Sequence, residues 1–179
     1  MHFYHVDRKN TLRPNTILKP KFLEFMETGE PFKNDRALIY NNGLSSHGLL
    51  YLTDNEALTP NFCFNTLFEV IIENVRLSYF PEKKSRFEAF FAFKTKEDAS
   101  IFLNSNTSLY KVETEDFFEA DMAWLDSNKV QQSLYPNCKL SVSMLEEFAY
   151  RYWAGEKTNS PVIEVLCYTP VKVLEQVLF

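Results

Sequence analysis

The order of strand-like and helix-like segments constrains the fold of this chain more than any other feature. Patterns typical of strands occur at residues 3–6, 16–18, 86–93, 109–113, 162–168 and 171–179. Patterns typical of helices occur at residues 21–28, 61–79 and 97–103, and after residue 143. Because strands outnumber helices and do not alternate with them regularly, the sequence predicts an α+β fold with a mostly antiparallel sheet.

Capping residues indicate where the helices begin and end. Thr59 precedes a proline, as at a helix start, and the apolar residues of the 61–79 helix cover more than one face, so we expect that helix to be largely buried. Thr95 and Ser143 are each followed three residues later by an acid, which is the capping-box pattern. Gly155 suits a helix C-terminus.

Length and composition predict a single domain. The 179 residues are 45% hydrophobic and include 17 Phe and 9 Tyr, which is enough for one large apolar core. Residues 29–50, rich in charge, Asn and Gly, are expected to form an irregular surface. No segment has the length or apolarity of a membrane span, and the start lacks a signal-peptide pattern. We therefore expect a cytoplasmic protein with no membrane partner.

Charge and ligand spacing argue against several classes of function. The net charge of −5 disfavours broad binding to nucleic-acid backbones, although a local basic rim is compatible with it. Three widely separated cysteines fit neither a disulfide framework nor a zinc site, so we expect reduced thiols and no metal. The sequence contains no glycine-rich phosphate loop and no nucleophile elbow.

Taken singly, the candidate site residues have ordinary structural explanations. A histidine in an apolar strand, such as His5, is more often a packing residue than a catalytic one. Ser85 and Arg86 suit either a phosphate site or a solvated basic turn. The acidic residues at 113–126 are typical of a solvated face.

Three segments in order resemble the small ADP-ribosyltransferases of the rifampicin-modifying type. The first comprises Phe-Tyr-His at 3–5 with the turn at 12–20, the second runs from 91 to 99, and the third from 109 to 121. The resemblance implies an ADP-ribosyltransferase-like fold, with a mostly antiparallel split sheet, flanking helices and a helical insertion at about 21–80. The implied activity is NAD-dependent transfer of ADP-ribose to a protein, RNA or small-molecule acceptor.

The same resemblance assigns roles to particular residues. Asp121 would be the catalytic acid, with Glu119 as the alternative, and His5 would bind a ribose hydroxyl. Phe93 or Phe91 would stack on nicotinamide. The pyrophosphate would be held by Arg86 with Ser85, and the pocket would also include Tyr4 and Arg8.

The chain departs from that transferase pattern at two positions. Val6 stands where the family has glycine, and phenylalanine stands where it has the stacking tyrosine. One alternative is therefore a non-catalytic module that keeps the fold and binds a nucleotide or a protein. Another is an interaction protein that exposes an aromatic patch, which we place at Phe117, Phe118, Tyr152 and Trp153.

The whole chain also resembles a bacterial family of unknown function, DUF2441. The segments that carry this likeness are Phe-Tyr-His-Val-Asp at 3–7, Ser-Arg-Phe to Phe-Ala at 85–92 and Tyr-Trp-Ala-Gly-Glu at 152–156. This resemblance implies no activity.

Overall fold

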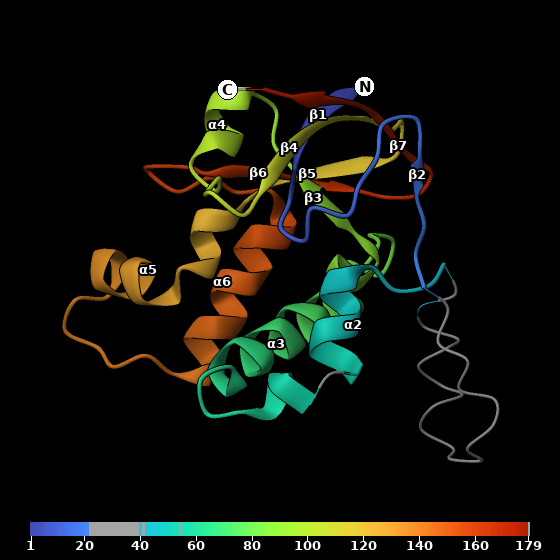
Figure 1. Ribbon diagram of the computed structural model, residues 1–179. Coiled ribbons are helices and arrows are strands. Elements are labelled where there is room, and N and C mark those ends of the chain that lie inside the picture. The colour runs from blue at the N-terminus through green and yellow to red at the C-terminus, as the bar shows by residue number, and fades with distance from the viewer. Residues whose placement is uncertain (22–39, 41, 54, 179) are drawn as a thin grey trace, which may run out of the picture.

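Two curled antiparallel sheets form one side of the molecule in the computed structural model, which describes residues 1–21, 40, 42–53 and 55–178 (Figure 1). The first sheet has the order β1 (His2–Asp7), β4 (Ser108–Glu113), β7 (Val171–Val177), β2 (Ile17–Leu18). The second has the order β3 (Phe90–Ala92), β6 (Ile163–Cys167), β5 (Phe117–Asp121). The α+β class with antiparallel sheets is thus confirmed.

The two sheets are joined between β1 and β3. Tyr4 and Phe93 exchange two backbone hydrogen bonds of 2.8 Å, which continue the pairing from the first sheet into the second. The apolar faces of the sheets enclose a common core, in which the rings of Phe3 and Phe117 lie 4.9 Å apart. Strand β1 therefore lies at the centre of the strand layers.

Helices cover the other side of the second sheet. The helical elements are α2 (Ser46–Thr53), η2 (Asn55–Leu58), α3 (Cys63–Tyr79), η3 (Arg86–Glu88), α4 (Lys96–Ser100), η4 (Met122–Leu125), α5 (Ser127–Leu134) and α6 (Val142–Ala154). Figure 1 shows α2, α3 and α6 beneath the strands and α4 beside the upper ones. Helices α3 and α6 pack on the sheet through a core that includes Ile72, Phe148 and Trp153.

Local capping signals place most of the helix ends. The Thr95 hydroxyl accepts a hydrogen bond from the Asp98 N–H at 3.1 Å at the start of α4, as predicted. Gly155 ends α6 with a φ of 76°, a left-handed conformation that glycine adopts without strain. The start of α6 differs from the prediction, because Ser141 rather than Ser143 provides its cap.

Several sequence-based expectations are wrong. Residues 86–93 do not form one strand, because η3 precedes the short β3. The region 29–50 is not irregular throughout, since α2 begins at residue 46. The long helix begins at residue 63, and several of its apolar side chains are exposed. The helix predicted at residues 21–28 lies almost wholly outside the described residues.

The predicted aromatic surface patch does not form. Tyr152 and Trp153 are fully buried, and the rings of Phe118 and Trp153 stack in the core 5.6 Å apart. Phe117 is partly buried against Phe3. Within the described part of the chain, no helix has the length and apolarity to cross a membrane.

Candidate functional site

The imidazole of His5 fills a break between two strands. After the Tyr4–Phe93 pair, an antiparallel ladder would next bond the N–H of Val6 to the carbonyl oxygen of Phe91. Instead, Nδ1 of His5 lies 2.7 Å from that carbonyl oxygen. Strand β1 therefore turns away from β3 at this point, and the His5 ring bridges the gap.

This hydrogen bond determines which nitrogen of His5 carries the proton. A carbonyl oxygen can only accept, so Nδ1 is the donor and Nε2 of the neutral ring is an acceptor. Burial lowers the pKa of His5, and it outweighs the opposing effects of the Phe91 carbonyl and Asp7. No hydrogen bond joins Nε2 to a described residue, and the His5 side chain is partly buried. His5 thus presents an oriented acceptor at neutral pH.

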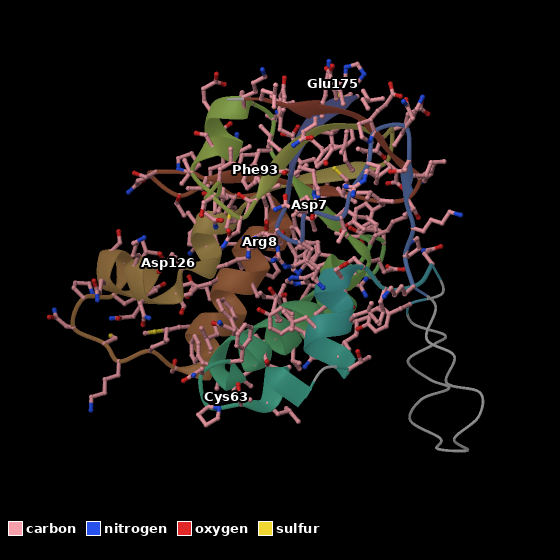
Figure 2. The ribbon with its side chains drawn as sticks, viewed as in Figure 1. Asp7, Arg8, Cys63, Phe93, Asp126 and Glu175 are labelled. Carbon is pink, nitrogen blue, oxygen red and sulfur yellow. The ribbon has the colours of Figure 1, made fainter. Side chains whose placement is uncertain are left out.

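The loop after β1 is held by Asp7 and carries Arg8, three residues after His5. The buried carboxylate of Asp7 accepts hydrogen bonds from the N–H groups of Lys9, Thr11 and Leu12 at 2.7–2.9 Å. These bonds fix a tight loop that begins at Arg8. The exposed Arg8 guanidinium makes no hydrogen bond or ion pair with the described residues, and its charge acts on His5. In the view of Figure 2, Arg8 lies between the strands and the helices.

Helix α2 contributes two aromatic rings to the same region. His47 and Tyr51 lie one helical turn apart, with ring centroids separated by 4.8 Å. The His47 ring also meets the ring of Phe91 edge-on at 4.8 Å. Because His47 contacts the Phe91 ring and His5 contacts the Phe91 carbonyl oxygen, α2 and β1 meet at Phe91. His5, Arg8, His47, Tyr51 and Phe91 are hereafter called the His5 site.

A buried network of charges supports the His5 site from beneath. Arg86 donates to both carboxylate oxygens of Glu69 at 3.2 Å, to the Tyr152 hydroxyl at 2.6 Å and to Glu164. Nε2 of His47 lies 3.3 Å from Glu69, without the alignment of a hydrogen bond. Burial opposes ionisation of Glu69, but Arg86 and His47 hold its pKa well below the usual range. Glu69 is therefore ionised beside Arg86.

This network occupies the two residues predicted to hold pyrophosphate. The guanidinium of Arg86 is 6% exposed and lies between the rings of Phe91 and Tyr152, at 4.8 and 5.1 Å. Ser85 is fully buried, where its hydroxyl donates to Glu73 at 2.9 Å and caps η3. Both side chains hold η3 against the helices, and neither faces the His5 site as a free donor.

The predicted catalytic acid is also engaged in the fold. Asp121 is 1% exposed, and its carboxylate accepts four hydrogen bonds of 2.7–3.0 Å, from Ala123, from Val162 and twice from Thr158. These bonds fasten the loop before β6 to the end of β5. The alternative acid, Glu119, is partly exposed and pairs with Lys94 at 2.7 Å. Of the two, only Glu119 is accessible to a ligand.

Two predicted pocket residues lie on a different face of β1 and β3. Tyr4 alternates with His5 along β1, so its side chain points to the opposite face. It packs there in a cluster with Phe93, whose ring stacks on Phe102 with centroids 4.7 Å apart. Of the two predicted stacking residues, only Phe91 contacts His5, and it does so through its backbone carbonyl oxygen, while its ring packs against His47 and Arg86.

Sequence reasoning missed Asp7, His47, Tyr51 and Glu69. The spacing of four residues between His47 and Tyr51 was a usable signal, but it required recognition of α2. Within the described part of the chain, no group of three or more His, Cys, Asp or Glu residues is arranged to hold a metal. An open groove of 340 Å³ between the ends of β4 and β7 has no ionisable lining residue, so it is a poor candidate for acid–base chemistry.

Comparison with known proteins identifies the family. The model of the family described as "Protein of unknown function (DUF2441)" matches residues 3–179. The chain belongs to the DUF2441 family. This agrees with the likeness seen in the segments at 3–7, 85–92 and 152–156. A comparison with curated proteins finds none that matches this DUF2441 chain.

Proposed function

We propose that this protein binds a nucleotide at the His5 site, and that this nucleotide is NAD. The observation that carries the proposal is the neutral His5 ring, whose Nδ1 is fixed by Phe91 and whose Nε2 is an acceptor without a hydrogen bond to any described residue. Ribose hydroxyls are donors that such a nitrogen can bind and orient. The predicted resemblance to NAD-using transferases names the same histidine.

The neighbours of His5 suit the other parts of a dinucleotide. Arg8 supplies a guanidinium, exposed and without a partner among the described residues, for a phosphate. Tyr51 and Phe91 are partly buried and supply aromatic surface for a base. Arg8 therefore replaces Arg86 as the proposed phosphate ligand, and Phe91 is kept in preference to Phe93.

Calorimetric titration with NAD tests this proposal. His5→Asn can keep the hydrogen bond to Phe91 through its amide nitrogen but has no group at the position of Nε2. We expect His5→Asn and Arg8→Gln each to weaken NAD binding at least about tenfold, which is about the free energy of one lost hydrogen bond. Lys9→Gln, a neighbouring exposed cation, should bind as the wild type does. Absence of NAD binding by the wild-type protein would reject the proposal.

A second candidate is ADP-ribose transfer, and the accessibility of Glu119 favours it. In the strand register, Glu119 lies opposite Val165 and Val165 lies opposite Ala92. The Tyr4–Phe93 register places Ala92 beside His5, so three strand spacings, roughly 14 Å, separate the two residues. Ala92 and Val165, which lie between His5 and Glu119, are buried, so a dinucleotide that reaches Glu119 would have to pass around these two positions. The carboxylate of Glu119 would stabilise the positive charge that develops on ribose when nicotinamide leaves.

Incubation with labelled NAD and cell lysate tests the transfer reaction separately. Glu119→Gln should abolish label transfer and leave the calorimetric affinity for NAD unchanged. Lys94→Gln removes the partner of Glu119 but keeps the acid, so label transfer should persist in that variant. Binding of NAD without any label transfer would leave the protein as a nucleotide-binding module.

A further inference from the structure

Helix α3 carries a second apolar stripe, on the side that faces away from the core. Its members are Cys63, Leu67, Val70, Asn74 and Leu77, all exposed, and this set is hereafter called the α3 seam. The three apolar members Leu67, Val70 and Leu77 are 48%, 38% and 41% exposed. From Cys63 to Leu77, successive members of the α3 seam are four, three, four and three residues apart. This is the a/d repeat of helices that pack against one another.

The charges of α3 are all on its other side. Glu69, Glu73 and Arg76 are 8%, 5% and 5% exposed and are held in the buried networks beneath the helix. The exposed residues of α3 are apolar or uncharged. A solvent-facing helix surface normally carries charged residues, whereas the cores of protein interfaces are depleted of them. The distribution of charge on α3 is therefore that of an interface helix.

We propose that the α3 seam binds the α3 seam of a second copy of this chain, with the two helices parallel. Each copy carries a net charge of −5, so two copies repel least through a face that has no charge. Asn74 lies at an a position, and in a parallel pair the two Asn74 amides meet and can bond to each other. A single asparagine at an a position favours a pair of parallel helices, rather than a larger bundle, and fixes their register.

The position of α3 leaves room for this contact. In Figure 1, α3 lies at the edge of the molecule away from the strands, and Figure 2 shows its first residue, Cys63, at the outer end of that helix. A helix of 17 residues is about 25 Å long and presents a little over two heptads. The helix is already folded by its buried face, so the seam does not have to order it on association.

The parallel register makes a specific chemical prediction. Cys63 occupies the first d position, so it faces Cys63 of the second copy. Mild oxidation of a Cys138→Ser protein, which removes the other exposed thiol, should give a covalent dimer on non-reducing gels. The Cys63→Ser, Cys138→Ser double variant should give none. Failure of Cys63 to cross-link in a dimeric protein would reject the parallel arrangement.

Light scattering tests the association itself. We expect a mass twice the 21.0 kDa of one chain, rising toward that value with protein concentration. Val70→Lys and Leu67→Lys should return the mass to that of a monomer, with circular dichroism unchanged because both side chains are exposed. Ile101→Lys is the matched control, because Ile101 is an apolar residue 72% exposed outside the seam, and that variant should remain dimeric.

Other results would overturn the proposal. A monomeric mass at every concentration would show that the seam binds a different partner or none. A dimer that survives Val70→Lys would show that another surface joins the copies. The proposal does not depend on the nucleotide site, since Val70→Lys should leave the calorimetric titration with NAD unchanged.

Discussion

Nδ1 of His5 donates a hydrogen bond over 2.7 Å to the carbonyl oxygen of Phe91, where the backbone of β1 no longer reaches β3. A side chain that replaces a ladder bond is fixed by the fold before any ligand arrives. The same bond leaves Nε2 as the acceptor atom of the ring, with no hydrogen bond to a described residue. Stability and ligand binding at His5 can therefore be separated by substitution.

The pH dependence of stability should depend on His5. Burial lowers the pKa of His5 in the folded protein, so below about pH 6.5 the unfolded chain binds a proton that the folded chain does not. The free energy of unfolding should therefore fall as pH falls from 6.5 toward the folded pKa, and be unaffected above that window.

Urea denaturation at several pH values, on wild type and His5→Asn, measures this effect. The variant should lose the His5 part of the slope, so the difference between the two proteins shrinks as pH falls. His5→Ala should be less stable than His5→Asn by about 1–2 kcal/mol at neutral pH, because it leaves the Phe91 carbonyl unpaired. Equal slopes in wild type and His5→Asn would show that His5 is not the titrating group.

Replacement of Arg86 should be among the most damaging single changes in the chain. Arg86→Met leaves Glu69 and Glu164 buried without their shared cation, which costs about 3–5 kcal/mol for a broken buried pair. Lys94→Met breaks the partly exposed pair with Glu119 and should cost less than about 1 kcal/mol. Chemical denaturation of both variants measures the contrast, and a similar cost for the two would contradict the structural role of Arg86.

Substitution of Asp121 should lower the free energy of unfolding, because this residue holds the loop before β6. In Asp121→Asn, the new amide N–H₂ faces backbone and hydroxyl donors instead of accepting from them, and loss of charge weakens the bonds that remain. We expect a loss of about 2–3 kcal/mol and faster proteolysis of the loop near residue 158, which Asp121 holds. Glu119→Gln should be nearly neutral in the same assays. An Asp121→Asn protein as stable as wild type would restore Asp121 as a candidate for chemistry.

Features that depend on neighbouring residues were predicted well. The cap at Thr95, the end of α6 at Gly155 and the strands at β1, β4, β6 and β7 follow from local hydrogen bonds and side-chain alternation. Each of these signals lies within a few residues of the structure that it specifies. The antiparallel class followed from the order of the elements, which is also visible along the chain.

Features that depend on distant residues could not be predicted. Arg86 looks like an exposed basic residue in sequence, but it binds Glu164, which is 78 positions away. Asp121 looks like a candidate acid, but Ala123 and the loop at 158–162 together donate four hydrogen bonds to its carboxylate. Both the exposed and the buried side of α3 carry large apolar residues, so the positions of those residues alone cannot tell which side is buried. In each case tertiary contacts decided which surface a side chain faces.

Gly48 controls the position of α2 and, through it, two residues of the His5 site. The backbone of η3 lies so close to this helix that a Cβ atom on Gly48 would be 2.3 Å from the carbonyl oxygen of Phe87. Ser45 fixes the same contact, because its N–H and its hydroxyl both donate to that oxygen, at 2.8 and 3.0 Å. An added methyl group must therefore displace the helix or the turn.

Gly48→Ala should lower stability by about 1–3 kcal/mol, as overpacking does, and should also weaken NAD binding because His47 and Tyr51 move with α2. Gly155→Ala is the matched control. It meets no atom within 4 Å, and its left-handed φ of 76° costs roughly 1–2 kcal/mol without moving the His5 site. Denaturation and calorimetric titration of both variants separate loss of stability from loss of geometry. Wild-type affinity for NAD in a folded Gly48→Ala protein would show that α2 does not form part of the nucleotide site.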